Sequence, residues 1–177
     1  MEIVGCSLDL APRVAKEKRV SHAISLLDPA NAFPSLHPLR DEAHLKIGMH
    51  DIAELVEGFE APGAHHVESA LRFAGSWDRA APILVHCWAG VSRSTATAFS
   101  IACAANPDAD ERLIAQTLRA ASATASPNLS IVALADEILK RRGRMYAAAE
   151  SIGRGNLLIT AQPFSIPAHY KPGTGAS

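Results

Sequence analysis

Residues 83–94 constrain the fold of this 177-residue chain more than any other stretch. They open with a short apolar run, Ile-Leu-Val, which is typical of a strand buried on both faces of a parallel sheet. Small and polar residues follow, and residues 94–105 then predict a helix. We therefore expect a strand, a tight loop and a helix, with Cys87 at the end of the strand and Arg93 entering the helix.

A loop of this kind predicts a binding site for an oxyanion, most naturally a phosphate. Successive backbone N–H groups point into one concavity, and the positive end of the helix dipole lies beneath it. The Cys87 thiol would lie among these donors and beside Arg93, which favours its thiolate form. A thiolate is a strong nucleophile that can form a covalent intermediate. The planar guanidinium of Arg93 matches two phosphate oxygens and binds them best in the transition state.

Two more residues complete the predicted chemistry. Ser94 can donate a hydrogen bond to the sulfur when the intermediate breaks down, and His86 is expected to orient the loop from behind. The chemistry is hydrolysis of a phosphate ester through a phosphocysteine, without a metal. The residues expected to surround the substrate phosphate are Trp88, Ala89, Gly90, Val91, Ser92 and Arg93.

The pattern His86-Cys87-x-x-Gly90-x-x-Arg93-Ser94 resembles the signature of the cysteine-based protein tyrosine phosphatase superfamily. It is most similar to the dual-specificity branch, in the single-domain form found in bacteria. A five-residue match at fixed spacing is far more specific than a lone glycine-rich motif. The resemblance implies a protein tyrosine phosphatase that acts on a phosphorylated protein or an aryl phosphate. It leaves open whether phosphoserine and phosphothreonine are also substrates. It also implies that phosphate, sulfate or vanadate can occupy the loop, and it implies no cofactor.

The same resemblance implies an α/β fold with a central, mostly parallel sheet of about four to five strands flanked by helices. It covers roughly residues 45–145. The length favours one catalytic domain at residues 1–150. Residues 151–177 are rich in Gly and Pro, and we expect an extension there that is partly ordered at best.

Several alternative functions remain open at this point. A buried structural cysteine before an ordinary capped helix would leave Gly90 and Arg93 unexplained. A rhodanese-like sulfurtransferase typically has one residue fewer between cysteine and arginine than the five found here. A non-catalytic phosphate-binding module normally lacks the cysteine or the arginine. Phosphatases of lipid or inositol phosphates tend to have lysines in the loop between the cysteine and the arginine. The corresponding loop of this chain has no lysine.

Asp51 is the predicted general acid that protonates the leaving oxygen. It follows a strand predicted at residues 44–50, at the sheet edge where Cys87 also lies. The resemblance implies an aspartate some three to four dozen residues before the cysteine, and here 87 − 51 = 36. Alternatively, Asp51 caps a helix at residues 53–59. The rival acids on the neighbouring segments are Asp41, Glu54, Glu57 and Glu60.

The hydrophobic periodicity predicts the remaining elements. Strands are expected at residues 2–8, 21–27, 44–50 and 83–87, and helices at 10–19, 64–80, 94–105, 111–123 and 129–142. Gly143 is the expected C-cap of the last helix, after a solvated basic end at residues 140–142. His65 and His66 diverge by about 100° on a helix, so we expect a solvated histidine face rather than a metal site.

Composition narrows the choice of partners. A formal charge of −1 indicates neither nucleic acid nor an anionic membrane surface. No apolar run approaches the roughly 18 residues of a membrane span, and the N-terminus lacks the pattern of a signal peptide. Three cysteines without metal-ligand spacing predict free thiols in a reducing compartment, which favours a cytoplasmic location.

Overall fold

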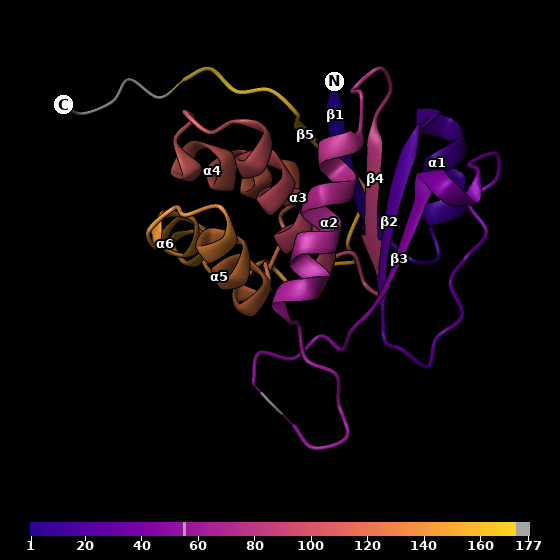
Figure 1. Ribbon diagram of the computed structural model, residues 1–177, viewed down its shortest axis with the longest axis horizontal. Helices are drawn as coiled ribbons and strands as arrows, with labels where there is room; N and C mark the ends of the chain where they lie inside the picture. The colour runs from indigo at the N-terminus through magenta and orange to yellow at the C-terminus, as the bar shows by residue number, and fades with distance from the viewer. Residues whose placement is uncertain (55, 173–177) are drawn as a thin grey trace.

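A five-stranded sheet in the order β3-β2-β4-β1-β5 forms the centre of the molecule (Figure 1). The computed structural model describes residues 1–54 and 56–172. Strands β1 to β4 run parallel, and β5 is antiparallel to β1, which confirms the predicted mostly parallel α/β sheet. The strands are β1 (Glu2–Ser7), β2 (His22–Leu27), β3 (His44–Gly48), β4 (Ile83–Cys87) and β5 (Phe164–Pro167).

Helices cover both faces of this sheet. Helix α1 packs against β1 and β4 on one face, whereas α2 to α6 gather on the other (Figure 1). The helices of the described residues are α1 (Ala11–Lys18), α2 (Ala64–Ser76), α3 (Arg93–Ala105), α4 (Glu111–Ala121), α5 (Leu129–Ile138) and α6 (Arg144–Ser151), with a 3₁₀ turn η1 (Asp41–Ala43).

Strand β4 lies in the middle of the sheet, and all five of its residues are buried. Because side chains alternate across a strand, Ile83 and Val85 join the larger core under α2 to α6, while Leu84 joins the smaller core under α1. This explains the continuous apolar run in the sequence. Cys87 pairs with Ser7 of β1 and Leu26 of β2, so the carboxyl ends of three parallel strands meet at one edge.

The predicted end of the chain's fifth helix is wrong. Helix α5 stops at Ile138, and Gly143 is the residue before α6, with a φ of 82°, rather than a C-cap of the preceding helix. Arg141 is not part of a solvated basic end, because only 5% of it is exposed. Its guanidinium pairs with Glu111 at 3.0 Å and donates to the carbonyl of Cys103 at 2.6 Å. This buried cation joins the segment after α5 to α3 and α4.

Helix α2 is also shorter than the predicted helix at residues 64–80, because it ends at Ser76. Trp77 follows it with its ring in the core, and the indole Nε1 donates to the carbonyl of Ala81 at 2.7 Å. A buried indole needs such an acceptor. The non-helical segment after Ser76 provides this acceptor.

Strand β5 lies in the segment that the sequence predicted to be a loosely ordered extension. It pairs with β1, and the ring of Phe164 packs on Gly5, where a Cβ would lie 2.1 Å from the ring. Ile166 is fully buried. Residues 164–167 thus complete the sheet, whereas the apolar run at 157–159 stays exposed.

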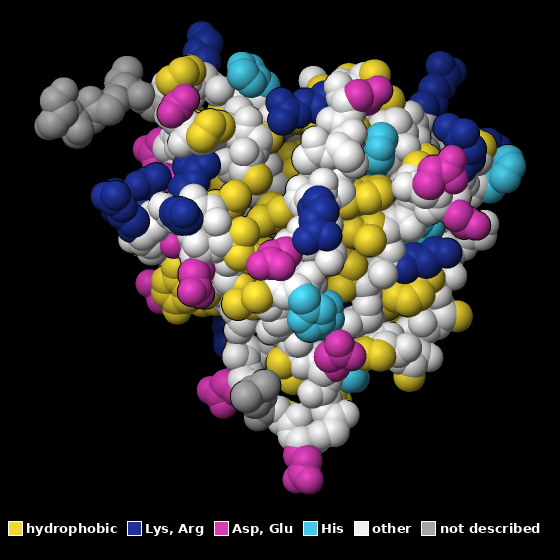
Figure 2. All heavy atoms as spheres, in the orientation of Figure 1, with side chains coloured by type: hydrophobic (Ala, Val, Ile, Leu, Met, Phe, Trp, Pro, Cys, Tyr) yellow, Lys and Arg dark blue, Asp and Glu magenta, His cyan; other side chains and the backbone are white. Residues whose placement is uncertain are grey.

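Basic and acidic side chains are interspersed over the face of the molecule seen in Figure 2. Among the described residues, no helix has both the length and the apolar character that crossing a bilayer requires.

Candidate active site

The cysteine loop, residues 87–93, connects the end of β4 to the start of α3. Its backbone lies against the end of β1, where the Leu8 amide donates to the carbonyl of Trp88 at 3.1 Å. Gly90 has a φ of 72°, and a Cβ there would lie 2.6 Å from the backbone nitrogen of Ser7. Only glycine combines this conformation with this close approach. The glycine of the sequence motif therefore sets the path of the loop.

The thiol at the start of the loop is buried beside a hydroxyl. Cys87 Sγ lies 3.2 Å from Ser94 Oγ, and both residues are inaccessible to solvent or nearly so. The Ser94 hydroxyl is therefore placed to donate to the sulfur when the sulfur is a thiolate.

Arg93 is held by one nitrogen only. Its Nη1 donates to Asp28 Oδ1 at 2.7 Å and to the carbonyl of Met49 at 2.6 Å. Its Nε is buried, finds no hydrogen-bond acceptor among the described residues, and lies 3.8 Å from Asp51 Oδ2. The side chain as a whole is only 3% exposed. One edge of a rigid guanidinium is thus fixed by the protein, and the Nε edge is left to bind an acceptor.

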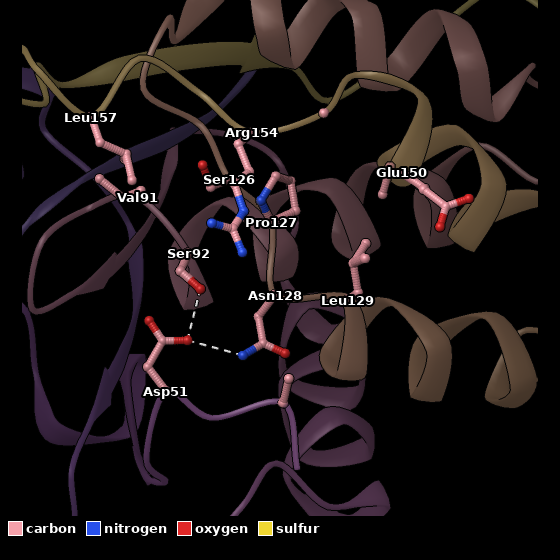
Figure 3. Close-up of a pocket in the computed structure, with 13 residues that line it drawn as sticks. Asp51, Val91, Ser92, Ser126, Pro127, Asn128, Leu129, Glu150, Arg154 and Leu157 are labelled. Atoms are coloured by element: carbon pink, nitrogen blue, oxygen red, sulfur yellow. Dashed lines mark hydrogen bonds between the residues drawn. The ribbon is translucent and has the colours of Figure 1, made fainter.

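Asp51 lies opposite the cysteine loop and is fixed by two hydrogen bonds. Ser92 Oγ donates to its Oδ1 at 2.7 Å, and Asn128 Nδ2 donates to the same oxygen at 2.9 Å (Figure 3). The Oδ1 atom of Asn128 meanwhile accepts from the amides of Ser130 and Ile131, which caps α5. Asn128 therefore ties the start of α5 to Asp51.

The alternative role of Asp51 as a helix cap is not observed, since no helix forms among the described residues of 53–59. Two of the rival acids have other neighbours. Glu60 hydrogen-bonds to His66, and the fully exposed Asp41 lies 4.0 Å from Lys46.

An open pocket of about 510 Å³ lies in front of the cysteine loop. Two exposed aromatic side chains flank it, Trp88 at 59% and Phe59 at 52% exposure. We call it the front pocket, and its lining residues are Asp28, Asn31, His50, Asp51, Ile52, Phe59, Trp88, Ala89 and Arg93. It has room for a phosphate ester with an apolar leaving group.

Behind the loop, His86 takes part in a buried hydrogen-bonded network with Ser25 and His44. Ser25 Oγ lies 2.5 Å from His86 Nε2 and 2.6 Å from His44 Nε2. Burial lowers the pKa of both histidines to about 4, with a further lowering of the His86 pKa by His44 and of the His44 pKa by Lys46. Both rings are therefore neutral at pH 7. Because Ser25 has one hydroxyl proton, one ring donates to it and the other accepts from it, so the tautomers of His44 and His86 are coupled.

The other two cysteines are buried in the core, away from solvent. Burial, together with the nearby Cys87, raises the pKa of Cys6 to about 12, and burial also raises the pKa of Cys103. Both are neutral thiols. They are therefore poor nucleophiles.

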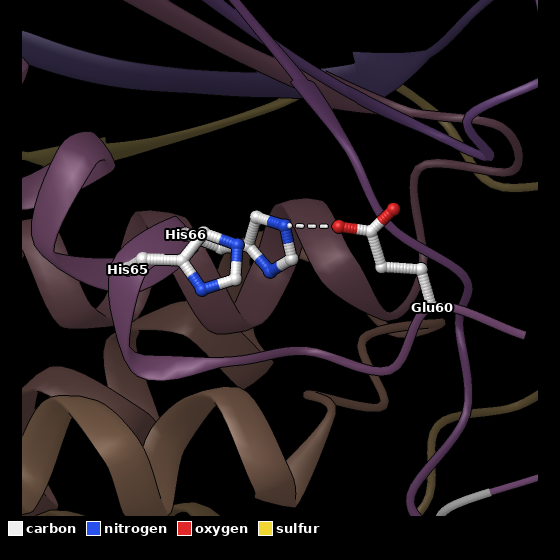
Figure 4. Close-up of side chains that lie close together, drawn as sticks. All are labelled: Glu60, His65 and His66. Carbon is white, nitrogen blue, oxygen red and sulfur yellow. Dashed lines mark hydrogen bonds and ion pairs between the residues drawn. The ribbon is translucent and has the colours of Figure 1, made fainter.

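The predicted solvated histidine face is wrong for His66, which is buried (Figure 4). The rings of His65 and His66 lie 3.7 Å apart, and ligand atoms of Glu60, His65 and His66 lie within 4.8 Å of one another. However, His66 Nδ1 accepts from the Gly63 amide at 3.1 Å, so Nε2 carries the ring proton and points to Glu60. A metal on Nε2 would force the proton onto Nδ1, against the Gly63 amide. These contacts suit a hydrogen-bonded helix start better than a metal site.

Three residues that support the site were missed in the sequence. Asp28 and Asn128 bind the side chains of Arg93 and Asp51, and Ser25 contacts His86. Asn128 directly precedes the helix predicted at residues 129–142, and asparagine at a helix start is a known capping signal. Nothing in the local sequence shows that its amide nitrogen is left for another partner.

No model of a protein family matches the chain, and no curated protein matches it either. Solved structures do. DUSP15 matches with 20% identity and a TM-score of 0.58 over 84% of this chain and 85% of that one. The PTP-2 phosphatase of Cydia pomonella matches with 20% identity and a TM-score of 0.56 over 75% and 83%. A mouse putative dual specificity phosphatase, solved as a complex with zinc tungstate, matches with 16% identity and a TM-score of 0.57 over 80% and 84%.

Sequence identities this low show similarity of fold and not of function. At that level they agree with the resemblance seen in the loop sequence: the chain has the fold of the cysteine-based protein tyrosine phosphatases, as found in their dual-specificity members.

Proposed function

We propose that this protein is a cysteine-dependent protein tyrosine phosphatase that hydrolyses phosphate monoesters through a phosphocysteine intermediate. The observation that carries the proposal is the Nε edge of Arg93, whose N–H has no hydrogen-bond acceptor among the described residues. A buried guanidinium N–H without an acceptor is costly, and a phosphate is the acceptor that its fork fits best. That edge belongs to the loop that begins with Cys87.

In the first step the Cys87 thiolate attacks phosphorus, the bond from phosphorus to the ester oxygen breaks, and Asp51 gives its proton to that oxygen. In the second step a water molecule gives a proton to the Asp51 carboxylate and attacks the phosphocysteine. The S–P bond then breaks, phosphate forms, and the thiolate leaves with a hydrogen bond from Ser94, which lies 3.2 Å away. Arg93 binds two phosphoryl oxygens in both steps.

The proposed substrate is a phosphotyrosine residue of a protein, or a simple aryl phosphate. The two aromatic side chains at the front pocket and the uncharged loop residues Trp88, Ala89, Val91 and Ser92 support it, because a polyanionic lipid headgroup would need more cations. A related fold, PTPMT1, was solved in complex with PI(5)P, at 15% identity and a TM-score of 0.50. Phosphate, sulfate and vanadate are proposed as ligands of the loop. The catalytic thiolate suits a reducing compartment such as the cytoplasm.

The decisive assay is steady-state hydrolysis of para-nitrophenyl phosphate. We expect turnover that survives EDTA and is inhibited competitively by vanadate, because the proposed mechanism needs no metal and vanadate mimics the phosphoryl group. Loss of turnover with EDTA would contradict the proposal. Sulfur transfer from thiosulfate to cyanide would indicate a rhodanese-like enzyme, and vanadate binding without turnover would indicate a binding module.

Asp51→Asn is expected to lower kcat for phenyl phosphate by about 10²–10⁴. The amide keeps an oxygen that can accept from Ser92 and Asn128, but it has no acidic proton for the leaving group. Hydrolysis of para-nitrophenyl phosphate should fall much less, because nitrophenolate leaves without protonation. The measurement is kcat for both substrates, with Glu57→Gln on the same loop as the matched control. An unchanged kcat for phenyl phosphate would move the acid role to another residue.

A further inference from the structure

A second groove, of about 550 Å³, adjoins the cysteine loop on the side of the C-terminal segment. We call it the C-terminal groove, and its principal residues are Val91, Ser92, Asn128, Leu129, Arg154 and Leu157 (Figure 3). Asp51 lines both this groove and the front pocket, so the two adjoin at that residue. The mechanism proposed above uses Asp51, its two hydrogen-bond partners and the cysteine loop, but not the side of the groove formed by Leu129, Arg154 and Leu157.

Arg154 places a positive charge over this groove, and it forms no ion pair with the residues that the structure describes. Its side chain extends in the direction of Ser92 and Asn128 in Figure 3, and it makes no hydrogen bond to the other residues drawn there. The carboxylate of Glu150, the nearest acidic side chain on α6, points away from it. The guanidinium is therefore available to an anion that reaches the groove beside the cysteine loop.

The rest of the groove is largely apolar and partly exposed. Leu157 is 62% exposed there, and the next residue, Leu158, is 97% exposed. Exposed leucines beside a groove are typical of a surface that contacts a partner. A ligand that fits has an anionic group for Arg154 and an apolar group for Leu129 and Leu157.

A peptide meets these requirements better than a bilayer does. An anionic membrane surface or a polyphosphorylated headgroup recruits clusters of cations, whereas this groove has one arginine and two carboxylates, Asp51 and Glu150. A peptide with one acidic side chain matches a single guanidinium. Its phosphorylated residue would lie in the front pocket, and its neighbours would pass Asp51 into the groove.

We propose that the C-terminal groove binds the segment next to the phosphorylated residue of a protein substrate, with an acidic side chain against Arg154 and an apolar side chain against Leu157. This inference rests on the proposed phosphatase function. It names the substrates within that function, which are phosphorylated residues close to an acidic residue.

The test compares two phosphotyrosine peptides that differ only in flanking glutamates, which are replaced by glutamines in the second peptide. We expect wild-type kcat/KM to be higher for the glutamate peptide by about fivefold, and the difference to shrink at high salt. Arg154→Glu should abolish this preference. Arg112→Glu, an exposed residue of α4 outside the groove, makes the same change in charge and should keep it.

The outcomes separate this inference from the proposed function. Equal kcat/KM for the two peptides, with intact turnover of para-nitrophenyl phosphate, would overturn the groove proposal and leave the phosphatase. Faster turnover of a phosphatidylinositol phosphate in phosphatidylcholine vesicles than of either peptide would also overturn it. Absence of turnover with every substrate, para-nitrophenyl phosphate included, would instead overturn the phosphatase function itself.

Discussion

Cys87→Ser is expected to abolish the hydrolysis of para-nitrophenyl phosphate, with less than a tenth of the wild-type turnover remaining. A serine hydroxyl at this position keeps its proton near neutral pH, whereas the proposed mechanism needs an anionic nucleophile and a covalent intermediate. The substitution replaces one small buried group, 1% exposed, by another of nearly equal volume. Loss of the reaction should therefore not require loss of the fold.

Phosphate binding distinguishes a catalytic loss from a structural one. The Cys87→Ser protein should still bind phosphate in a calorimetric titration, because the backbone amides of the loop and Arg93 are unchanged. Cys103→Ala is the matched control, since it removes a buried thiol of α3 outside the loop and should keep turnover per folded molecule. Residual turnover above a tenth of wild type in Cys87→Ser would contradict the covalent mechanism.

The centre of this fold could be predicted because its signals are local. A strand buried on both faces must be continuously apolar, and Ile83, Leu84 and Val85 are all fully buried, on alternating sides of β4. Gly90 is similarly informative, because its positive φ and its contact with β1 exclude any side chain. The cysteine loop thus carries its geometry in its own residues.

The elements that the sequence missed depend on distant partners. Strand β5 has few residues and is ordered by its pairing with β1, and the ring of Phe164 fits only because residue 5 is glycine. In the sequence Arg141 looks like one of three exposed cations. In the structure it is buried, and it binds Glu111 and the carbonyls of Pro107 and Cys103, which lie 34 and 38 residues before it. Interactions between segments far apart in the chain leave no periodic pattern in the sequence from which they could be predicted.

The same limit applies to the candidate site. The motif marks Cys87 and Arg93, but the groups that hold the site residues in place come from elsewhere. Asp28 and Asn128 lie 65 and 77 residues from the side chains that they bind. The position of Asp51, directly after a predicted strand, is enough to suggest an acid at that edge of the sheet. Only the folded chain shows that Ser92 and Asn128 fix its carboxylate.

Arg93→Lys is expected to lower kcat/KM for para-nitrophenyl phosphate by about 10³, since one lost oxyanion donor typically costs 10²–10³ and the fork loses more than one. A lysine ammonium is a point charge on a flexible stem. It can reach Asp28 or the substrate phosphate, but it cannot satisfy Asp28, the Met49 carbonyl and two phosphate oxygens in one fixed plane. The loss should appear in the affinity for vanadate as well as in kcat.

Asp28→Asn separates the two edges of that guanidinium. It removes the charge that orients Nη1 but leaves the Nε edge and its proposed contact with phosphate intact. If Arg93 acts through the Nε edge, Asp28→Asn should cost far less activity than Arg93→Lys. If the two variants lose the same activity, or if Arg93→Lys keeps more than a tenth of it, the arginine serves mainly to pair with Asp28 and Met49. The phosphate would then have to be bound by the loop amides alone.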